Sequence, residues 1–402
     1  MDKYLLPIIW LAKLISFICK ALRLGTGSTW AGHVALTLYP TILRCLEDDL
    51  VHGSILITGT NGKTTTVKML VSILEKDGRS VVFNPTGANL LNGITSALIA
   101  NVAFWGRPHS EMGVFEIDEA SFPLALKMYD PEAVVVLNLF RDQLDRYGEI
   151  DLTAEKIHQA LKGLSKGSVV VLNANNDYVN RLGKNLSAKV LYFDVCSCEP
   201  LARPSVYLSR FKIDGFDFET PLGGSYTIEN ALAAITVARS LGVGYEAMQE
   251  ALRNFRPAFG RQEEFEIGGK RVKILLSKNP EGFNQNVKML QSLETIETLL
   301  LVLNDNIPDG RDVSWIWDTS PASLLKLSRL IIVSGLRAED MILRLKYSQR
   351  EYQISNIQYQ KNLKKALRLG LDETSKGSTL YIMPTYSAML EVRKILTGRK
   401  IL

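Results

Sequence analysis

The sequence is poor in the residues that build metal sites and covalent frameworks. Its 402 residues include four cysteines and four histidines. So few cysteines in a chain of this length do not make a disulfide framework, so a reducing compartment is expected. Cys196 and Cys198 are separated by one residue and no second pair follows them, so no structural zinc is predicted. The histidines share no motif with a cysteine, so the chain offers no Cys-His nucleophile of its own.

Excess charge and uninterrupted apolar runs are also scarce. Lys and Arg number 47 against 42 Asp and Glu, a small and dispersed excess that predicts no nucleic-acid partner. The apolar stretch 5–24 contains Lys13, Lys20 and Arg23, whereas a spanning helix needs about 20 residues with few charges. No convincing cleavage site follows it, which argues against a signal peptide. We therefore expect a cytoplasmic protein whose amphipathic first helix packs on the protein or lies at the inner membrane face.

Two successive alternations of strands and helices follow. At about 100–200 residues per domain, the length predicts two or three domains. Short apolar strands expected at 54–58, 133–137 and 168–172 resemble buried parallel strands. A second series begins after residue 261, with strands expected at 272–276, 299–303, 330–334 and 379–383. The predicted fold is α/β: a short helical segment at 1–50, a P-loop central domain with a mostly parallel sheet at 51–262, and a Rossmann-like C-terminal domain at 263–402.

A glycine-rich loop joins the first predicted strand to a helix. It consists of Gly59, Thr60, Asn61, Gly62, Lys63, Thr64 and Thr65. Glycines let the backbone approach an anion, and the N-terminus of a helix stabilises negative charge. Lys63 would reach the β- and γ-phosphates and Thr64 would hold Mg²⁺. Ile57 stands where the usual Walker pattern has its first glycine, so the loop is a shortened variant. The alternative to a nucleotide site is a plain turn between strand and helix, but such a turn would not require a lysine at position 63.

An acidic cluster ends a later strand. Glu116 is followed closely by Asp118 and Glu119. Glu116 could pair with an arginine, but so dense a group of carboxylates favours a cation site.

These motifs together resemble the Mur ligase superfamily, the ATP-dependent ligases that build peptidoglycan stems and folate polyglutamates. The resemblance covers about residues 50–265. Besides the glycine-rich loop and Glu116, the segments that carry it are Thr86–Asn89, Asn138–Gly148, the helix containing Asn230, and Phe259–Glu263.

The last third resembles the MurT family, the Mur-ligase-like subunits of lipid II isoglutaminyl synthase. The segments concerned are Ser277–Asn284, Asn304-Asp305, Asp309–Asp318 and Pro384–Leu390. The resemblance implies ATP-dependent amidation of the D-glutamate α-carboxyl of the lipid II stem peptide to D-isoglutamine, through an acyl phosphate. It also implies that a separate glutaminase subunit of the GatD type supplies the ammonia. Many members carry a four-cysteine zinc ribbon where this chain has only Cys196 and Cys198.

The same resemblance implies roles for individual residues at an ATP and magnesium site. Lys63, Glu116 and Lys278 would be catalytic, and Lys278 would contact the γ-phosphate after domain closure. Thr64, Thr86 and Glu116 would bind Mg²⁺. On local evidence alone, Lys278 could instead be a solvated loop lysine.

Four further residues have two interpretations each. Asn230 would meet the adenine or ribose, or could be a helix N-cap. Arg261 would contact phosphate, or pair with a neighbouring glutamate. Asp312, and with less support Asp309, would complete the partner's Cys-His pair, although an Asp-Gly pair is also a common turn signal.

Two other functions fit parts of the pattern. An amino-acid-adding Mur or folylpolyglutamate-type ligase would share the first 265 residues, but segment 309–318 argues against it. A non-enzymatic P-loop module would bind nucleotide only to switch a partner. The acidic cluster and Lys278 favour an enzyme instead.

Overall fold

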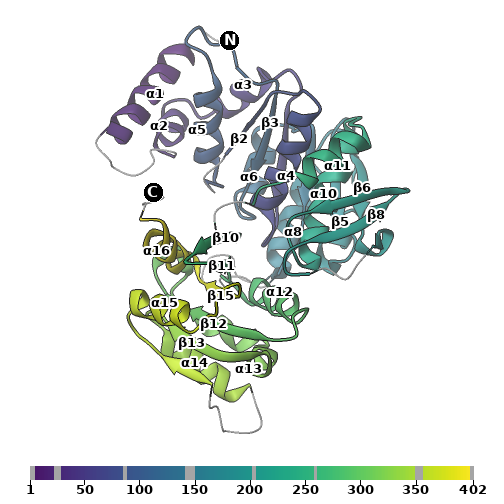
Figure 1. Ribbon diagram of the computed structural model, residues 1–402. Helices are drawn as coiled ribbons and strands as arrows, with labels where there is room; N and C mark the ends of the chain where they lie inside the picture. Colours follow the sequence, from purple (N-terminus) through teal and green to yellow (C-terminus); the bar gives the residue numbers. More distant parts are fainter. Residues whose placement is uncertain are drawn as a thin grey trace.

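The computed structural model describes residues 5–21, 29–84, 88–140, 150–201, 205–257, 260–348 and 356–398. The expected magnesium ligand Thr86 and most of segment 138–148 lie outside these ranges. Two six-stranded sheets and one three-stranded sheet form the framework. Figure 1 shows the N-terminal helices and the first large sheet in the upper part of the molecule and the C-terminal sheet below. The predicted α/β class is therefore confirmed.

The first sheet is parallel throughout and has the strand order β2-β3-β1-β4-β5-β6. Its strands are β1 (Ser54–Thr58), β2 (Val81–Phe83), β3 (Met112–Glu116), β4 (Ala133–Val136), β5 (Val169–Asn173) and β6 (Lys189–Phe193). The central strands β1, β3 and β4 are buried along their whole length, as expected of strands covered on both faces. Because β1 lies between β3 and β4, the chain reverses its winding direction there, and such a reversal creates a crevice at the carboxyl ends of the strands.

Helices cover both faces of this sheet. Alternate residues of the strands pack with α4 (Lys63–Lys76), α10 (Ser225–Ser240) and α11 (Tyr245–Arg253) on one side. The other face packs with α5 (Leu91–Asn101), α6 (Phe122–Met128), α8 (Ile150–Leu161) and α9 (Asp177–Arg181). A small antiparallel sheet of β7 (Glu199–Pro200), β8 (Ser209–Ile213) and β9 (Phe216–Thr220) extends the α10 side. Helix α11 was not predicted.

The N-terminal helices share the core of the central sheet. They are α1 (Leu5–Ala21), α2 (Trp30–Leu38) and α3 (Ile42–Asp48), and their buried side chains join the cluster that contains α5. Gly32 of α2 donates its N–H to Ser96 Oγ of α5 at 2.7 Å. Among the described residues, no helix is both long and apolar enough to cross a membrane.

The C-terminal sheet has the order β10-β11-β15-β12-β13-β14, and only the β10–β11 pair is antiparallel. Its strands are β10 (Arg261–Ile267), β11 (Lys270–Leu275), β12 (Ile296–Val302), β13 (Ser328–Ser334), β14 (Ile357–Tyr359) and β15 (Thr379–Pro384). The helices around it are α12 (Pro280–Leu290), α13 (Ala322–Leu327), α14 (Ala338–Tyr347), α15 (Leu363–Asp372) and α16 (Tyr386–Thr397). The two edge strands, β10 and β14, were not predicted, because β10 carries several charged residues and β14 is only three residues long, two of them exposed.

Candidate active site

The glycine-rich loop connects β1 to α4 at the carboxyl edge of the central sheet. Gly62 is the N-cap of α4, and Lys63 is its first residue. Thr66 donates its N–H to the Gly62 carbonyl at 2.9 Å, which begins the hydrogen-bond ladder of the helix. The backbone N–H groups of Lys63, Thr64 and Thr65 therefore point from the N-terminal end of α4, where an anion would meet them.

Asn138, which follows β4, holds this loop in place. Its side-chain oxygen accepts the Asn61 N–H at 2.8 Å, and its amide donates to the Asn61 carbonyl at 3.1 Å. Thr60 donates its N–H to the Asn138 carbonyl at 3.0 Å and accepts the Phe140 N–H at its hydroxyl at 3.0 Å. These hydrogen bonds between protein groups fix the shape of the loop. The sequence of the glycine-rich loop did not predict that Asn138 would hold it in place.

Gly62 allows a close approach that no other residue would permit. Its φ is +88°, and a Cβ there would lie 2.2 Å from Asn230 Oδ1. Asn230 is buried within α10 and accepts a hydrogen bond from the Thr66 hydroxyl at 3.3 Å. The alternative that Asn230 is an N-cap is wrong, because Gly224 occupies that position. Asn230 instead packs against Gly62 and supports the glycine-rich loop from helix α10.

Lys63 is buried against the acidic cluster. Its Nζ lies 3.1 Å from Glu119 Oε2 and also donates to the Gly59 carbonyl. Burial lowers the pKa of Lys63, but Glu119, with Asp118 and Glu116 beyond it, outweighs burial and raises that pKa overall. Burial likewise raises the pKa of Glu119, but Lys63 and Lys278 bring it below its usual value. Both groups are therefore charged at neutral pH.

Thr64 and Glu116 bring two oxygen ligands together at the end of β3. The Thr64 hydroxyl donates to the Glu116 carboxylate, which is buried. Asn84 fixes the Glu116 backbone, accepting its N–H at 2.9 Å and donating to its carbonyl at 2.9 Å. A hydroxyl beside a carboxylate fits Mg²⁺, which binds through few protein oxygens and keeps water or phosphate as its other ligands. Within the described ranges, no group of three or more His, Cys, Asp or Glu side chains could hold a metal by itself.

The C-terminal domain contacts the phosphate loop directly. Asn279, the N-cap of α12, donates to Asn61 Oδ1 at 3.0 Å, and Asn61 donates back to Asn279 Oδ1 at 3.3 Å. Lys278 precedes it, and its charge is close enough to help lower the pKa of Glu119. The structure therefore brings Lys278 to the same site as Lys63, although 215 residues separate them in the sequence.

The connection between the domains places Arg261 near the same carboxylates. Arg261 is half-buried; burial lowers the pKa of its guanidinium, while the nearby Glu116 opposes that change. The next residue, Gln262, has a φ of +57°, an uncommon backbone conformation for a residue other than glycine. Its side chain pairs with the Gly223 backbone, accepting the N–H at 2.8 Å and donating to the carbonyl at 2.7 Å. Gln262 thus attaches the start of β10 to the central domain.

Asp309 and Asp312 have different environments. Asp309 is buried at the end of a short 3₁₀ helix (Ile307–Asp309) and accepts the N–H of Ser387 at 2.7 Å as well as its hydroxyl. Burial raises the pKa of Asp309 against these hydrogen bonds. Asp312 is exposed, and its two oxygens accept the N–H and hydroxyl of Ser314, each at 2.8 Å. Of the two carboxylates, only that of Asp312 lies at the surface.

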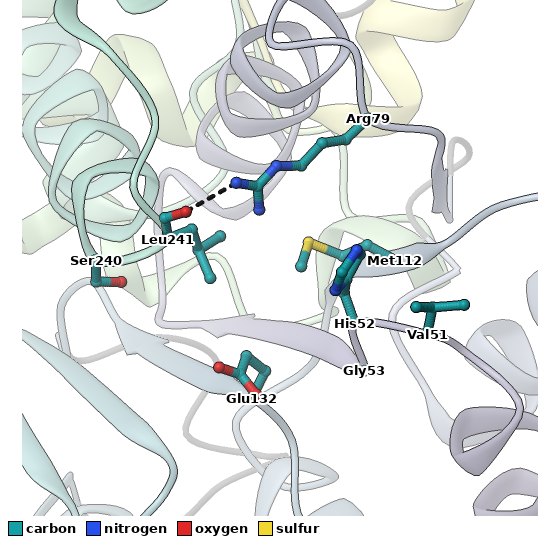
Figure 2. A pocket seen from close by; sticks show the side chains of 8 residues that line it. All are labelled: Val51, His52, Gly53, Arg79, Met112, Glu132, Ser240 and Leu241. Carbon is teal, nitrogen blue, oxygen red and sulfur yellow. Dashed lines mark hydrogen bonds between the residues drawn. The ribbon is translucent and has the colours of Figure 1, made fainter.

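The remaining predicted features lie elsewhere. Cys196 is exposed, whereas Cys198 is buried and donates its thiol to the Val195 carbonyl at 3.0 Å. A cavity of about 560 Å³ opens near His52, Arg79 and Glu132 (Figure 2). It also borders Gly53 and Met112, at the amino ends of β1 and β3, so it is on the opposite edge of the sheet from the phosphate loop.

Comparisons with known proteins agree with this architecture. Residues 57–238 match the Mur ligase middle domain, and residues 276–389 match the MurT ligase C-terminal domain. The chain is 32% identical to the lipid II isoglutaminyl synthase (glutamine-hydrolyzing) subunit MurT of Streptococcus pneumoniae, over 94% of each chain. It is 31% identical to the protein of the same name from Staphylococcus aureus, over 95% of each chain.

A solved structure shares the fold at lower sequence identity. The MurF ligase of Thermotoga maritima, in complex with ADP, superposes with a TM-score of 0.71 at 17% identity, covering 90% of this chain and 82% of that one. The sequence similarity extends across both large sheets and the segments between them. The chain therefore belongs to the MurT family within the Mur ligases.

Proposed function

We propose that this chain is the ATP-dependent ligase subunit of a lipid II isoglutaminyl synthase. It would convert the D-glutamate α-carboxyl of the stem peptide to a carboxamide, giving D-isoglutamine. The observation that carries the proposal is the similarity to subunits of that name over almost the entire chain. The two domains also meet at the phosphate loop, as a reaction between nucleotide and a second substrate requires.

The reaction must first make the carboxylate electrophilic. A carboxylate oxygen attacks the γ-phosphorus of ATP, the bond to the bridging oxygen breaks, and ADP leaves. Ammonia then attacks the carbonyl carbon of the acyl phosphate, inorganic phosphate leaves, and the nitrogen loses a proton. Bringing two anions together is the main electrostatic obstacle, so the protein must supply positive charge in a site shielded from water.

In this proposal, positive charge would reach the phosphates from three directions. The N-terminus of α4 and Lys63 would face the phosphates from the central domain, with Glu119 holding the lysine in place until nucleotide displaces it. Lys278 would approach from the C-terminal domain, and Arg261 from the connection between the two. Mg²⁺ held by Thr64 and Glu116, with Thr86 as the further ligand expected from the sequence, would neutralise additional phosphate charge.

Ammonia would come from a glutaminase subunit. The relatives are named as subunits, so they belong to complexes. The exposed carboxylate of Asp312 fits the proposed role of orienting a histidine on a partner, whereas buried Asp309 serves its own domain. We propose a cytoplasmic enzyme whose substrate is presented at the inner membrane face.

The test combines the chain with a glutaminase subunit, ATP, magnesium and a stem-peptide precursor. The expected product carries a carboxamide, detected by mass spectrometry, with either glutamine or ammonium as the nitrogen source. Ammonium alone would suffice without the partner. Attachment of a free amino acid would indicate an amino-acid-adding ligase. ATP binding without turnover of any nucleophile would indicate a nucleotide-binding module.

A further inference from the structure

The first helix is apolar on two opposite sides. Leu5, Ile9 and Ala12 are buried against the rest of the protein. On the other side, an exposed stripe has the spacing i, i+1, i+4, i+7 and i+8 and consists of Trp10, Leu11, Leu14, Phe17 and Ile18. Leu14 is 53% exposed and Phe17 is 69% exposed. A helix that only packs on its own protein has no need of a second apolar side.

A neighbouring turn extends this stripe with two aromatic side chains. Phe104 is 62% exposed and Trp105 is 81% exposed. Phe104 stacks on Trp10 with ring centroids 5.1 Å apart, and Trp10 Nε1 donates to the Phe104 carbonyl at 3.0 Å. Lys13 also ties the helix to this turn by donating to the Val102 carbonyl. We call the stripe together with Phe104 and Trp105 the N-terminal apolar patch.

The sequence around the patch lacks negative charge. Residues 3–46 and 84–110 contain no aspartate or glutamate, so all 42 acidic residues of the chain lie outside these segments. The two segments supply all of α1, α2, α5 and the aromatic turn, which pack together at the outer end of the molecule (Figure 1). In the sequence these segments carry the cationic residues Lys3, Lys13, Lys20, Arg23, Arg44 and Arg107, of which Arg44 pairs with Asp48, just beyond the first segment, at 3.8 Å.

We propose that the N-terminal apolar patch binds the surface of an anionic lipid bilayer. Apolar and aromatic side chains would enter the boundary between headgroups and acyl chains, and the exposed Arg107, in the same turn as Phe104 and Trp105, would meet a lipid phosphate. A second copy of the chain is a poorer occupant, since a symmetric dimer would place two surfaces of the same charge against each other. Because α1 is held rigidly by Trp10 and Lys13, little order is lost on binding.

This inference goes beyond the proposed chemistry and can fail independently, because vesicle binding requires neither ATP nor the glutaminase. If the proposed function holds, the same surface would bring the active site to a lipid-linked substrate.

The test is cosedimentation of the full-length chain with vesicles of phosphatidylcholine alone or mixed with phosphatidylglycerol. We expect binding to the anionic vesicles, weakened by salt and much lower on neutral ones. The double variant Leu14→Glu/Phe17→Glu should reduce that binding by about tenfold or more, because it removes apolar contact and adds repulsion. Leu152→Glu is the matched control, since Leu152 is 52% exposed on helix α8. It should bind as the unaltered chain does.

Further measurements distinguish the alternatives. Trp105→Ser tests the patch without altering α1 and should also weaken binding. Nucleotide affinity, unchanged in all variants, would show that they are folded. Absence of vesicle binding, or equal loss in the Leu152 control, would overturn the inference. So would gel filtration showing a dimer that Leu14→Glu/Phe17→Glu dissociates, because the patch would then be covered by a second copy.

Discussion

Replacing Gly62 with alanine should disable the nucleotide site for a steric reason. The residue has φ +88°, and an added Cβ would lie 2.2 Å from Asn230 Oδ1. Gly78, just beyond the other end of α4, is a matched control: its φ is +85°, and a Cβ there would meet nothing within 4 Å. Both alanine variants carry the left-handed backbone cost of about 1–2 kcal/mol.

Unlike Gly78→Ala, the Gly62→Ala variant also forces the new Cβ into the space occupied by Asn230. Relieving such an overlap by moving the loop or Asn230 costs about 2 kcal/mol, within the range for inserted methyl groups in packed sites. If that cost falls on the nucleotide-binding conformation of the loop, ATP affinity falls roughly thirtyfold relative to Gly78→Ala. Titration calorimetry with a non-hydrolysable ATP analogue would measure the difference, and thermal melting would report the loss of stability shared by both variants.

A double variant separates the steric explanation from a direct role of Asn230. Asn230→Ala alone removes one hydrogen bond with Thr66, worth about 1 kcal/mol, and should leave most affinity intact. Combined with Gly62→Ala, it removes the overlapping atom and should restore most of the lost affinity. The reasoning is refuted if Gly62→Ala binds as well as Gly78→Ala, or if the double variant shows no recovery. Severe loss in Asn230→Ala alone would instead support the adenine contact implied by the family resemblance.

Four further variants test other parts of the structure. Glu47 lies in helix α3, and burial raises its pKa to about 7 from an unfolded value near 4.5. The folded protein therefore holds the protonated form of Glu47 more tightly than the unfolded chain does. This contribution to stability is fully present below pH 4.5 and is lost as the pH rises through 7. Glu47→Gln should therefore stabilise the protein at pH 8 by about 2 kcal/mol and show no gain at pH 4. Equal melting shifts at both pH values would contradict this. Asn279→Asp keeps the α12 cap but loses the donor to Asn61, so we expect about tenfold lower turnover without a lower melting temperature; unchanged turnover would show that this contact is dispensable. Asp312→Asn should lower glutamine-dependent but not ammonium-dependent amidation, whereas Asp309→Asn should chiefly lower the melting temperature; loss of both activities in Asp312→Asn would place its role in the ligase itself.

Local motifs explain why much of the site could be predicted. The segment 59–65 combines a preceding apolar strand, two glycines and a lysine, and these features act within a few residues of one another. Glu116 was similarly visible as a carboxylate at a strand end. The two asparagines that contact this loop, Asn138 and Asn279, could not be identified in the same way. Asn138 contacts a loop 77 residues away and Asn279 one 218 residues away, so neighbouring residues hold no signal of either contact.

The edge strands show the same limit at the level of the fold. A central strand such as β4 is entirely apolar because both its faces are covered, and this pattern is readable directly. β10 has one buried position, Gln262, among half-buried and exposed residues with several charges, and it is identified by its pairing with β11. Likewise, the sequence favours Asp312 over Asp309 only slightly and gives no sign of their different burial. Packing against Ser387 buries one and leaves the other at the surface.

The sequence by itself determined the class of fold, the phosphate loop and the family, because hydrophobic periodicity and glycine placement act over short distances. Tertiary structure alone decided that Asn230 supports Gly62 from behind and that Lys278 and Arg261 approach the carboxylates around Lys63. It also decided that one side of α1 remains exposed beside Phe104 and Trp105. These relations depend on how separate elements pack, and packing brings together charges and surfaces that the order of residues keeps far apart.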